Sequence, residues 1–347
     1  MLRHRRTGCP DPALGMIVSR TPLRISFVGG GTDLPEFYEQ RGGAVVSTSI
    51  DKWIYVVVAR RFEGDIRVSY SKTEIVPTAS ELEHELVREG LRATGMPRGL
   101  DIATLADVPS GTGLGSSSTV MVGLLAALYA FQGRYRSPTE LAEEASQIEI
   151  EALGKPIGRQ DQYAAAVGGF NLIEFLPGGG GVRVEPIIAP QGMMESLHRS
   201  MLLFYTGRQR AADSVLSAQK TAIVAGTGST VPALEAMRDL AYELRDRLSN
   251  GDRDAMGELL DRNWELKRSL AEGITNPGID AWCERAREAG ATGGKLLGAG
   301  SSGFLLLVVP DAAQAKVRAA LHDLREVPFR FAARGVHIPL FEPVDML

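Results

Sequence analysis

The chain of 347 residues is poor in cysteine and histidine, and each shortage excludes a kind of chemistry. Its two cysteines, Cys9 and Cys283, are too few for a disulfide framework or a cysteine zinc site. This content fits a reducing, cytoplasmic setting. The five histidines fall outside the glycine-rich and acidic segments described below. We therefore do not expect nucleophilic or metal chemistry that depends on histidine.

Long apolar runs and an excess of basic residues are also missing. No run approaches the roughly 20 apolar residues that cross a bilayer, so no membrane partner is expected. The net charge of −4 offers no basic footprint for nucleic acid. Residues 1–15 are basic but lack the apolar core of a signal peptide, and we expect them to form a disordered leader.

The hydrophobic pattern predicts an α+β protein, and the length suggests two domains. In the first half we expect strands at 18–28, 44–61, 66–76 and 100–105, and on both sides of a Pro-Gly-Gly-Gly-Gly turn at 177–181. Capping boxes that begin at Ser80 and Ser137 predict helices to about Thr94 and Leu153. The second half predicts helices at 209–225, 231–249, 253–271, 278–289 and 311–324, and strands at 201–205, 304–309 and 328–339. The predicted domains are residues 16–190 and 191–347.

A glycine- and serine-rich segment, P-S-G-T-G-L-G-S-S-S-T from Pro109 to Thr119, stands directly before the most apolar helix. The backbone N–H groups of such a turn, continued by those of a helix start, form an anion site. Three glycines let the backbone approach a phosphate without a Cβ clash: Gly111, Gly113 and Gly115. The serines behind them can cap the helix, bind phosphate oxygens or ligate Mg²⁺: Ser116, Ser117 and Ser118. The alternative is a plain turn before an over-capped helix, and the local pattern favours phosphate.

Two further segments are rich in glycine. In R-I-S-F-V-G-G-G-T-D, residues 24–33, the arginine inside a strand needs a partner, and Asp33 follows three glycines where a ligand can come close. Taken alone, a tight turn in which Asp33 bonds its own backbone is the better interpretation. In G-G-K-L-L-G-A-G-S-S-G, residues 293–303, the glycines indicate backbone packed against a ligand or against the first loop, with a mobile hairpin as the alternative.

The helix that begins at Ser137 carries two glutamates in different surroundings. Glu149 borders the apolar stripe of this helix, so its carboxylate needs a cation or hydrogen-bond donors, whereas Glu151 points toward solvent. The stripe consists of Leu141, Ala145, Ile148 and Ala152. Asp161 either caps the next helix, which is the commoner role, or forms with Glu149 a carboxylate pair for Mg²⁺ and proton transfer.

Taken in chain order, these segments resemble the motifs of the GHMP kinase superfamily of sugar and metabolite kinases. Residues 109–118 are similar to its phosphate loop, P-x-x-x-G-L-[GS]-S-S, and residues 24–33 and 298–303 to its first and third motifs. The resemblance implies a two-domain GHMP kinase fold. In that fold an N-terminal mixed-sheet domain binds ATP, the C-terminal α+β domain is rich in helices, and the active site lies between them.

Within the superfamily, the stretches P-L-R-I-S-F-V-G-G-G-T-D-L-P and G-R-Q-D-Q-Y-A-A-A-V resemble the heptose 7-phosphate kinase branch. This resemblance implies ATP-dependent phosphorylation of the anomeric hydroxyl of D-glycero-D-manno-heptose 7-phosphate, for nucleotide-activated heptose and surface polysaccharide. Galactokinases carry Glu-His where this chain has Gly30 and Gly31, which argues against galactose. Two alternatives stay open: an L-fucose or other sugar 1-kinase, and a non-catalytic sugar and ATP sensor of the same fold.

The resemblance also implies a role for each motif residue. Asp161 is the expected catalytic carboxylate, ionised because Arg24 pairs with it, and Glu149 and Ser117 are the expected Mg²⁺ ligands. The residues expected to bind ATP are Pro109, Gly111, Gly113, Leu114, Gly115, Ser116, Ser117 and Ser118. Those expected to bind the sugar substrate are Gly30, Gly31, Thr32, Asp33, Gly300 and Arg210, the last of them for the distal phosphate. The expected partners are ATP and a small-molecule sugar phosphate, and a homodimer stays open.

Overall fold

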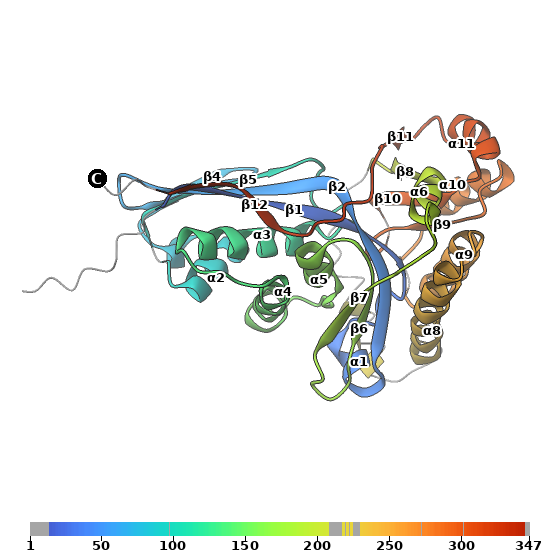
Figure 1. The fold of residues 1–347 in the computed structure, drawn as a ribbon, viewed down its shortest axis with the longest axis horizontal. Helices are drawn as coiled ribbons and strands as arrows, with labels where there is room; N and C mark the ends of the chain where they lie inside the picture. Colours follow the sequence, from blue (N-terminus) through green and yellow to red (C-terminus); the bar gives the residue numbers. More distant parts are fainter. Residues whose placement is uncertain are drawn as a thin grey trace, which may run out of the picture.

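The structure is a computed structural model that describes residues 14–343 except 97, 208–216, 219, 222, 225–229, 272 and 301. Its elements form two units, each a β-sheet with helices packed against it (Figure 1). In this part of the chain, no helix combines the length and the apolar character that crossing a membrane requires.

The larger sheet is mixed and belongs to the first unit. Its main path runs β12-β1-β2-β5-β3-β4, and a hairpin of β6 and β7 branches from β2. The pair of β3 and β5 is parallel, and the other pairs are antiparallel. The strands are β1 (Leu14–Val28), β2 (Gly43–Arg60), β3 (Ile66–Ser69), β4 (Thr73–Val76), β5 (Leu100–Ala106), β6 (Phe170–Phe175), β7 (Val182–Pro186) and β12 (His337–Pro343).

Strand β2 is the longest strand of this sheet and organises it. One of its edges pairs with β1, and the other is shared between β6 at residues 43–48 and β5 at residues 54–60. Residues 43–50 are buried on both faces, whereas burial alternates from residue 53 to residue 59. Small and β-branched residues suit such a doubly covered strand. The covered part of β2 pairs with residues 23–28 of β1, so this end of β1 lies inside the molecule.

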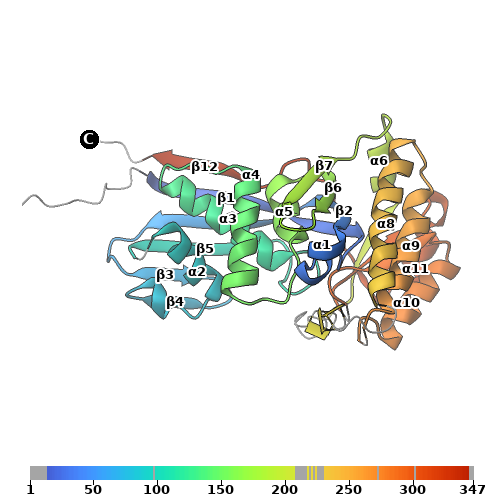
Figure 2. The ribbon, with the colours of Figure 1, turned by 90° about the horizontal axis from the view of Figure 1, so that it is seen from below.

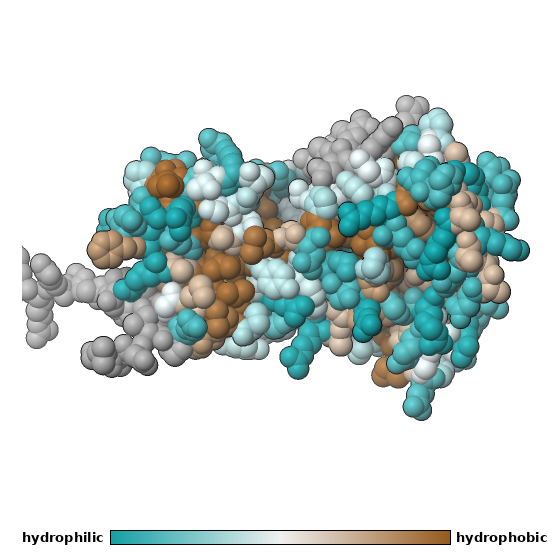
Figure 3. All heavy atoms as spheres, turned by 90° about the horizontal axis from the view of Figure 1, so that it is seen from above, coloured by the Kyte–Doolittle hydropathy of each residue, from teal (hydrophilic) through white to brown (hydrophobic). Residues whose placement is uncertain are grey.

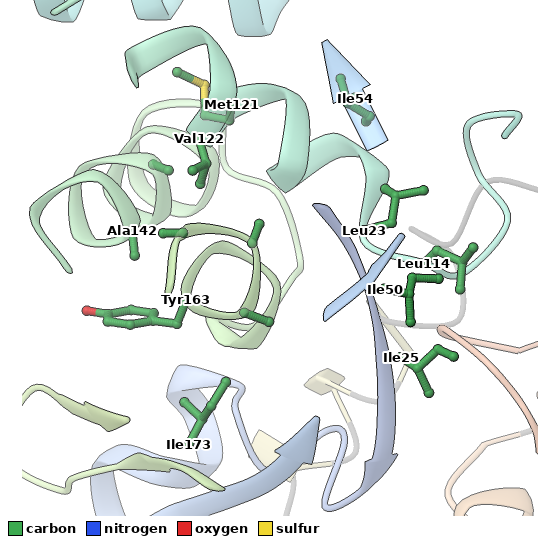
Figure 4. Packing of buried hydrophobic residues seen from close by; sticks show 14 of the residues in the cluster. Leu23, Ile25, Ile50, Ile54, Leu114, Met121, Val122, Ala142, Tyr163 and Ile173 are labelled. Carbon is green, nitrogen blue, oxygen red and sulfur yellow. The ribbon is translucent and has the colours of Figure 1, made fainter. Parts of the chain in front are cut away.

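Helices cover one face of the large sheet, as Figure 2 shows. They are α1 (Pro35–Arg41), α2 (Glu85–Thr94), α3 (Ser116–Phe131), α4 (Pro138–Ser146) and α5 (Gln160–Val167). Helix α3 is buried nearly all round, because it packs against β1 and β2 and also against α2, α4 and α5. Figure 4 shows Met121 and Val122 of α3 close to Ala142 of α4 and Tyr163 of α5 within one hydrophobic cluster.

Among the described residues, no helix of the first unit lies on the opposite face of the large sheet. Figure 3 looks onto this side and shows hydrophobic residues gathered over the sheet. Trp53, Tyr55 and Val57 of β2 are half-buried here, in alternation with the buried residues of the other face. The Arg20 guanidinium lies 3.9 Å from the centroid of the Trp53 ring, which shields part of this aromatic surface.

The second unit has a four-stranded sheet in the order β11-β8-β10-β9. Its strands are β8 (Met201–Tyr205), β9 (Gly293–Leu296), β10 (Phe304–Val308) and β11 (Arg325–Glu326). Its helices are α6 (Met193–Arg199), α8 (Thr230–Ser249), α9 (Ala255–Arg268), α10 (Pro277–Glu288) and α11 (Gln314–Ala320), with the 3₁₀ turn η3 (Asp311–Ala313) before α11. The chain then returns to the first unit, because β12 pairs with β1.

Some predicted elements are wrong in detail. The capping box expected at Ser80 gives only the 3₁₀ turn η1 (Ala79–Glu81), and α2 begins at Glu85. The cause is the Glu74 carboxylate, which accepts the N–H groups of the two residues before α2, at 2.6 and 3.1 Å. A turn divides the predicted strand 66–76 into β3 and β4, with an N–H bond from Tyr70 to the Lys72 carbonyl.

The helix predicted from Ser137 keeps its capping box but changes its winding. Residues 147–152 form the π-helix η2 (Gln147–Ala152). The wider turn of a π-helix shifts the helical register, and Ala152 is exposed rather than part of the buried stripe. At the C-terminal end, the strand expected at 328–339 begins only at His337, and most of the helix expected at 209–225 lies outside the described residues.

Candidate active site

A cavity of about 590 Å³ lies where the predicted motif segments meet. It is lined by the end of β1, the loop before α3, the π-helix, the start of α5 and the loop after β9. The lining includes the following predicted site residues: Arg24, Asp33, Ser117, Glu149, Asp161 and Gly300. Segments that are far apart in the sequence therefore form a single site, as the motif analysis predicted.

Arg24 and Asp161 form a two-point ion pair in this cavity. Arg24 Nε donates to Asp161 Oδ1 and Nη2 donates to Oδ2, both at 2.8 Å, while Nη1 donates to the Gly113 carbonyl at 2.6 Å. The arginine side chain is 5% exposed and the aspartate side chain 23%, so the carboxylate keeps one edge open to the cavity. Arg159 occupies the N-cap of α5, which excludes the alternative that Asp161 caps this helix.

The glycine–serine segment wraps around the start of α3. Gly115 is the N-cap residue with φ of 77°, and a Cβ there would lie 3.1 Å from Asp161 Oδ2. Glycine thus lets the helix start reach the carboxylate. Of the residues expected to bind ATP, two are absent from the cavity wall, Pro109 and Leu114. Leu114 is fully buried, and its carbonyl accepts the Arg24 backbone N–H at 3.1 Å.

The third motif packs directly against the first turn of the glycine–serine loop. A Cβ at Gly113 would lie 2.4 Å from the Leu297 carbonyl oxygen, and one at Gly298 would lie 2.4 Å from Gly113 Cα. A Cβ at Gly303 would lie 2.4 Å from the Thr112 carbonyl oxygen. These glycines let two backbones meet, which confirms the expectation that the third motif packs against the first loop.

The Glu149 carboxylate is fully buried at the edge of the cavity. Its Oε1 accepts from Ser117 Oγ at 2.8 Å, and its Oε2 accepts from Gln162 Nε2 at 2.7 Å. Burial raises the pKa of Glu149, although these hydrogen bonds act in the opposite direction. The π-helix places Glu149 here, whereas Glu151 on the same helix is exposed as predicted.

The first motif forms a tight turn around Asp33. The carboxylate accepts from the N–H of Gly31 at 2.9 Å and from the N–H of Gln160 at 3.3 Å. Burial, followed by the nearby Asp161, raises the pKa of Asp33. Gly30 and Gly31 line the cavity, but Thr32 does not: its hydroxyl is fully buried and bonds the carbonyls of Gly29 and Ala44, at 2.8 and 3.0 Å.

Sequence reasoning missed two lysines in the cavity wall, Lys267 and Lys295. Lys295 Nζ donates to the carbonyls of Ser26 and Phe27, at 2.9 and 2.8 Å, and burial lowers its pKa well below the usual range. Lys267 Nζ donates to the Gly298 carbonyl, and burial, followed by the nearby Arg24, lowers its pKa to about 8. The signal for Lys295 was its place inside the glycine-rich segment 293–303, whereas nothing in the pattern of α9 marks Lys267.

One other prediction concerns a cation. Arg210, expected at the distal phosphate of a substrate, lies outside the described residues. Arg159, two residues before Asp161, pairs with Glu143 and is absent from the cavity wall.

The end of the cavity away from Asp161 is more apolar. Here Tyr70 and His84 meet edge to face with ring centroids 4.5 Å apart. Leu86 and Leu105 line the same cavity, and Leu105 is 63% exposed. This wall was not predicted from the sequence, because its residues come from the turn between β3 and β4, the start of α2 and β5, without a shared pattern.

Comparison with known proteins places this chain in a described class. Residues 81–169 match the family description "GHMP kinases N terminal domain", and residues 233–324 match "GHMP kinases C terminal". The chain is 29% identical over 337 residues to the D-glycero-alpha-D-manno-heptose 7-phosphate kinase of Campylobacter jejuni, covering 92% of this chain and 98% of that protein. It is 30% identical over 328 residues to the galactokinase of Thermococcus kodakarensis, covering 83% and 88% of the two chains.

A solved structure agrees with these sequence relatives. The D-glycero-D-manno-heptose 1-phosphate kinase of Bacteroides thetaiotaomicron superposes with a TM-score of 0.74 at 28% identity, over 93% of this chain and 98% of that one. A two-unit α+β fold with a glycine-rich loop before a buried helix, facing an arginine–aspartate pair, defines a class of phosphotransferases. The chain belongs to the GHMP kinase family.

Proposed function

We propose that this kinase transfers the γ-phosphoryl group of ATP to the anomeric hydroxyl of D-glycero-D-manno-heptose 7-phosphate. The product is the 1,7-bisphosphate, made in the cytoplasm for nucleotide-activated heptose and surface polysaccharide. One observation carries the proposal: the Arg24–Asp161 pair lies against Gly115 at the start of α3, where an added Cβ would be 3.1 Å from the carboxylate. An anion at the helix start and a hydroxyl beside Asp161 would therefore be neighbours.

The cavity suits ATP at both of its ends. Apart from the Gly111 N–H, which donates to Ser116 Oγ at 3.4 Å, the N–H groups of the glycine–serine loop and of the first turn of α3 can donate to phosphate oxygens. The positive end of the helix dipole adds to this attraction. The apolar wall with Tyr70, Leu86 and Leu105 suits a purine base. These features support a nucleotide that lies along the cavity with its terminal phosphate toward Asp161.

The chemistry follows from the positions of the charged groups. The acceptor oxygen attacks the γ-phosphorus, the bond to the β-phosphate oxygen breaks, and the hydroxyl proton passes to Asp161. A loose transition state lets the proton pass to Asp161 late in the reaction. Arg24, which bonds Asp161 through two N–H groups, would stabilise charge on the phosphoryl oxygens while it orients that carboxylate.

Glu149 and Ser117 fit a Mg²⁺ site. The Glu149 carboxylate is fully buried, and the partners that the described residues give it are hydroxyl and amide groups without positive charge. A buried carboxylate in such surroundings favours a cation, and hard oxygen donors suit Mg²⁺. Bound Mg²⁺ would neutralise phosphate charge, and Ser117 and Glu149 would hold it beside the loop.

A heptose phosphate as acceptor is supported by the first motif and by the relatives. Gly30 and Gly31 leave space in the cavity wall, and Asp33 presents a carboxylate there for sugar hydroxyls. The two similar proteins from Campylobacter jejuni and Bacteroides thetaiotaomicron bear names of heptose phosphate kinases. Both are similar over more than nine-tenths of this chain.

The test is ADP release by purified protein with Mg-ATP and a panel of sugars and sugar phosphates. We expect rapid release with D-glycero-D-manno-heptose 7-phosphate and little with L-fucose or galactose. Rapid release with L-fucose would assign a different acceptor. Binding of sugar and ATP without any release would identify a sensor of the same fold.

A further inference from the structure

One lysine of the cavity wall, Lys267, has no carboxylate partner among the described residues. In the described part of the chain, the lysine and arginine residues of this wall are Arg24, Lys155, Lys267 and Lys295. Arg24 pairs with Asp161, and Lys155 pairs with Glu85 at 2.5 Å. Lys295 Nζ is held by two backbone carbonyls. Lys267 is the member of this set that has neither a carboxylate partner nor a second carbonyl among the described residues.

Lys267 stands in the last turn of α9, with its side chain nearly buried at 7% exposure. Its ammonium has three N–H donors, and the Gly298 carbonyl uses one of them. Arg24, Asp33, Asp161 and Lys295 are the charged groups close enough to act on it. A buried cation in this position is costly alone and is stabilised when an anionic group of a ligand reaches it.

Unpartnered polar atoms also line this cavity. Ser26 Oγ and Gln160 Oε1 are buried and make no hydrogen bond in the structure. Both residues line the cavity, and both flank the open position over Gly30, where a Cβ would lie 3.5 Å from Ser26 Oγ and 3.7 Å from Gln160 Nε2. Buried polar atoms of this kind normally have a hydrogen-bond partner, and the hydroxyl groups of a ligand would supply one.

We propose that Lys267 binds the phosphate that the acceptor already carries, while Ser26 and Gln160 bind its hydroxyl groups. The inference rests on the proposed function, because it concerns the acceptor end of the same site. The ATP phosphates already have the loop N–H groups and Arg24, so a second phosphate needs a cation of its own. Lys267 thereby separates phosphorylated from neutral sugars.

The test compares Lys267→Met and Lys267→Gln with the wild type on matched acceptors. The acceptors are D-glycero-D-manno-heptose 7-phosphate and the same heptose without phosphate, each assayed by ADP release. Both variants should raise KM for the phosphorylated heptose by about 10-fold or more, because a charge-assisted hydrogen bond is lost. KM for ATP and kcat/KM for the neutral heptose should stay near the wild-type values.

Lys52→Met is the matched control, since Lys52 pairs with Asp51 and is absent from the cavity wall. It should leave both acceptors unchanged, and thermal unfolding should show that the Lys267 variants are folded. Equal losses for the two heptoses, or a loss confined to kcat, would overturn the inference, since Lys267 would then act on the transferred group. If the wild type is active and the Lys267 variants have the same kinetic constants, the inference is overturned but the proposed function is not. A wild type that turns over no phosphorylated sugar would overturn the proposed function and the inference with it.

Discussion

Replacing Asp161 with asparagine should nearly abolish turnover in a protein that remains folded. The carboxylate accepts two N–H groups of Arg24 at 2.8 Å, and asparagine keeps one acceptor oxygen but places an NH₂ group against the guanidinium. The loss of a charge-assisted hydrogen bond costs about 1.5–3 kcal/mol. Because the Asp161 side chain is 23% exposed, water can replace part of the lost bond. We therefore expect a loss of about 1–2 kcal/mol in the free energy of unfolding, against the roughly 5–15 kcal/mol that is typical of proteins.

The rate should fall much further than the stability. Without a carboxylate to accept the hydroxyl proton, kcat should drop by about 10²–10⁴-fold. The assay is ADP release at saturating ATP and sugar phosphate, with nucleotide binding and thermal unfolding measured on the same sample. Asp101→Asn is the control, because Asp101 is similarly exposed at 25% and pairs with Arg67 at 2.7 Å, but is absent from the cavity wall. If Asp161→Asn kept more than about a tenth of the wild-type kcat, the role given to this carboxylate would be refuted.

Three further predictions test the metal, the acceptor phosphate and the missed lysine. Glu149→Gln should raise the Mg²⁺ concentration needed for half-maximal rate by about 10-fold or more, whereas Glu151→Gln, at an exposed position, should not. A larger increase for Glu151→Gln than for Glu149→Gln would show that the wrong glutamate is assigned. For the phosphorylated acceptor, kcat/KM should fall as pH rises through about 8, because Lys267 loses its charge there. Burial, followed by the nearby Arg24, lowers the pKa of Lys267 to about 8, while Asp33 and Asp161 act in the opposite direction. Lys267→Met should lack this step, and a wild-type profile without it would contradict the assignment. Arg210→Ala should raise KM for the phosphorylated heptose by about 10-fold or more and barely change KM for ATP. An equal loss of kcat/KM with the phosphorylated and the neutral heptose would exclude a phosphate contact.

The fold and the site motifs could be predicted because their signals are local. The alternation and β-branching of β1 and β2, the capping box at Ser137 and the glycine–serine run before α3 each depend on neighbours in the chain. That Arg24 needs a partner could be predicted because it is an arginine inside a strand, but Asp161 was named as that partner only by the resemblance to the family.

What could not be predicted depends on contacts between distant segments. The Glu74 carboxylate displaces the start of α2, and the π-helix at residues 147–152 changes which residues of its helix are buried. Lys267 looks like an ordinary helix-end lysine in the sequence, and only the approach of α9 to the third motif buries it. The hydroxyl of Thr32 was expected at the substrate, but the turn of the first motif uses it to hold its own backbone.

The most direct test of the central claim is the position of the new phosphoryl group in the product. Wild-type protein should be incubated with Mg-ATP and D-glycero-D-manno-heptose 7-phosphate, and the product followed by phosphorus NMR with coupling to the sugar protons. We predict a second phosphorus signal that couples to the anomeric proton, absent when Asp161→Asn replaces the wild type. A new phosphate on any other carbon, or ADP formed without a new sugar phosphate, would contradict the proposed reaction.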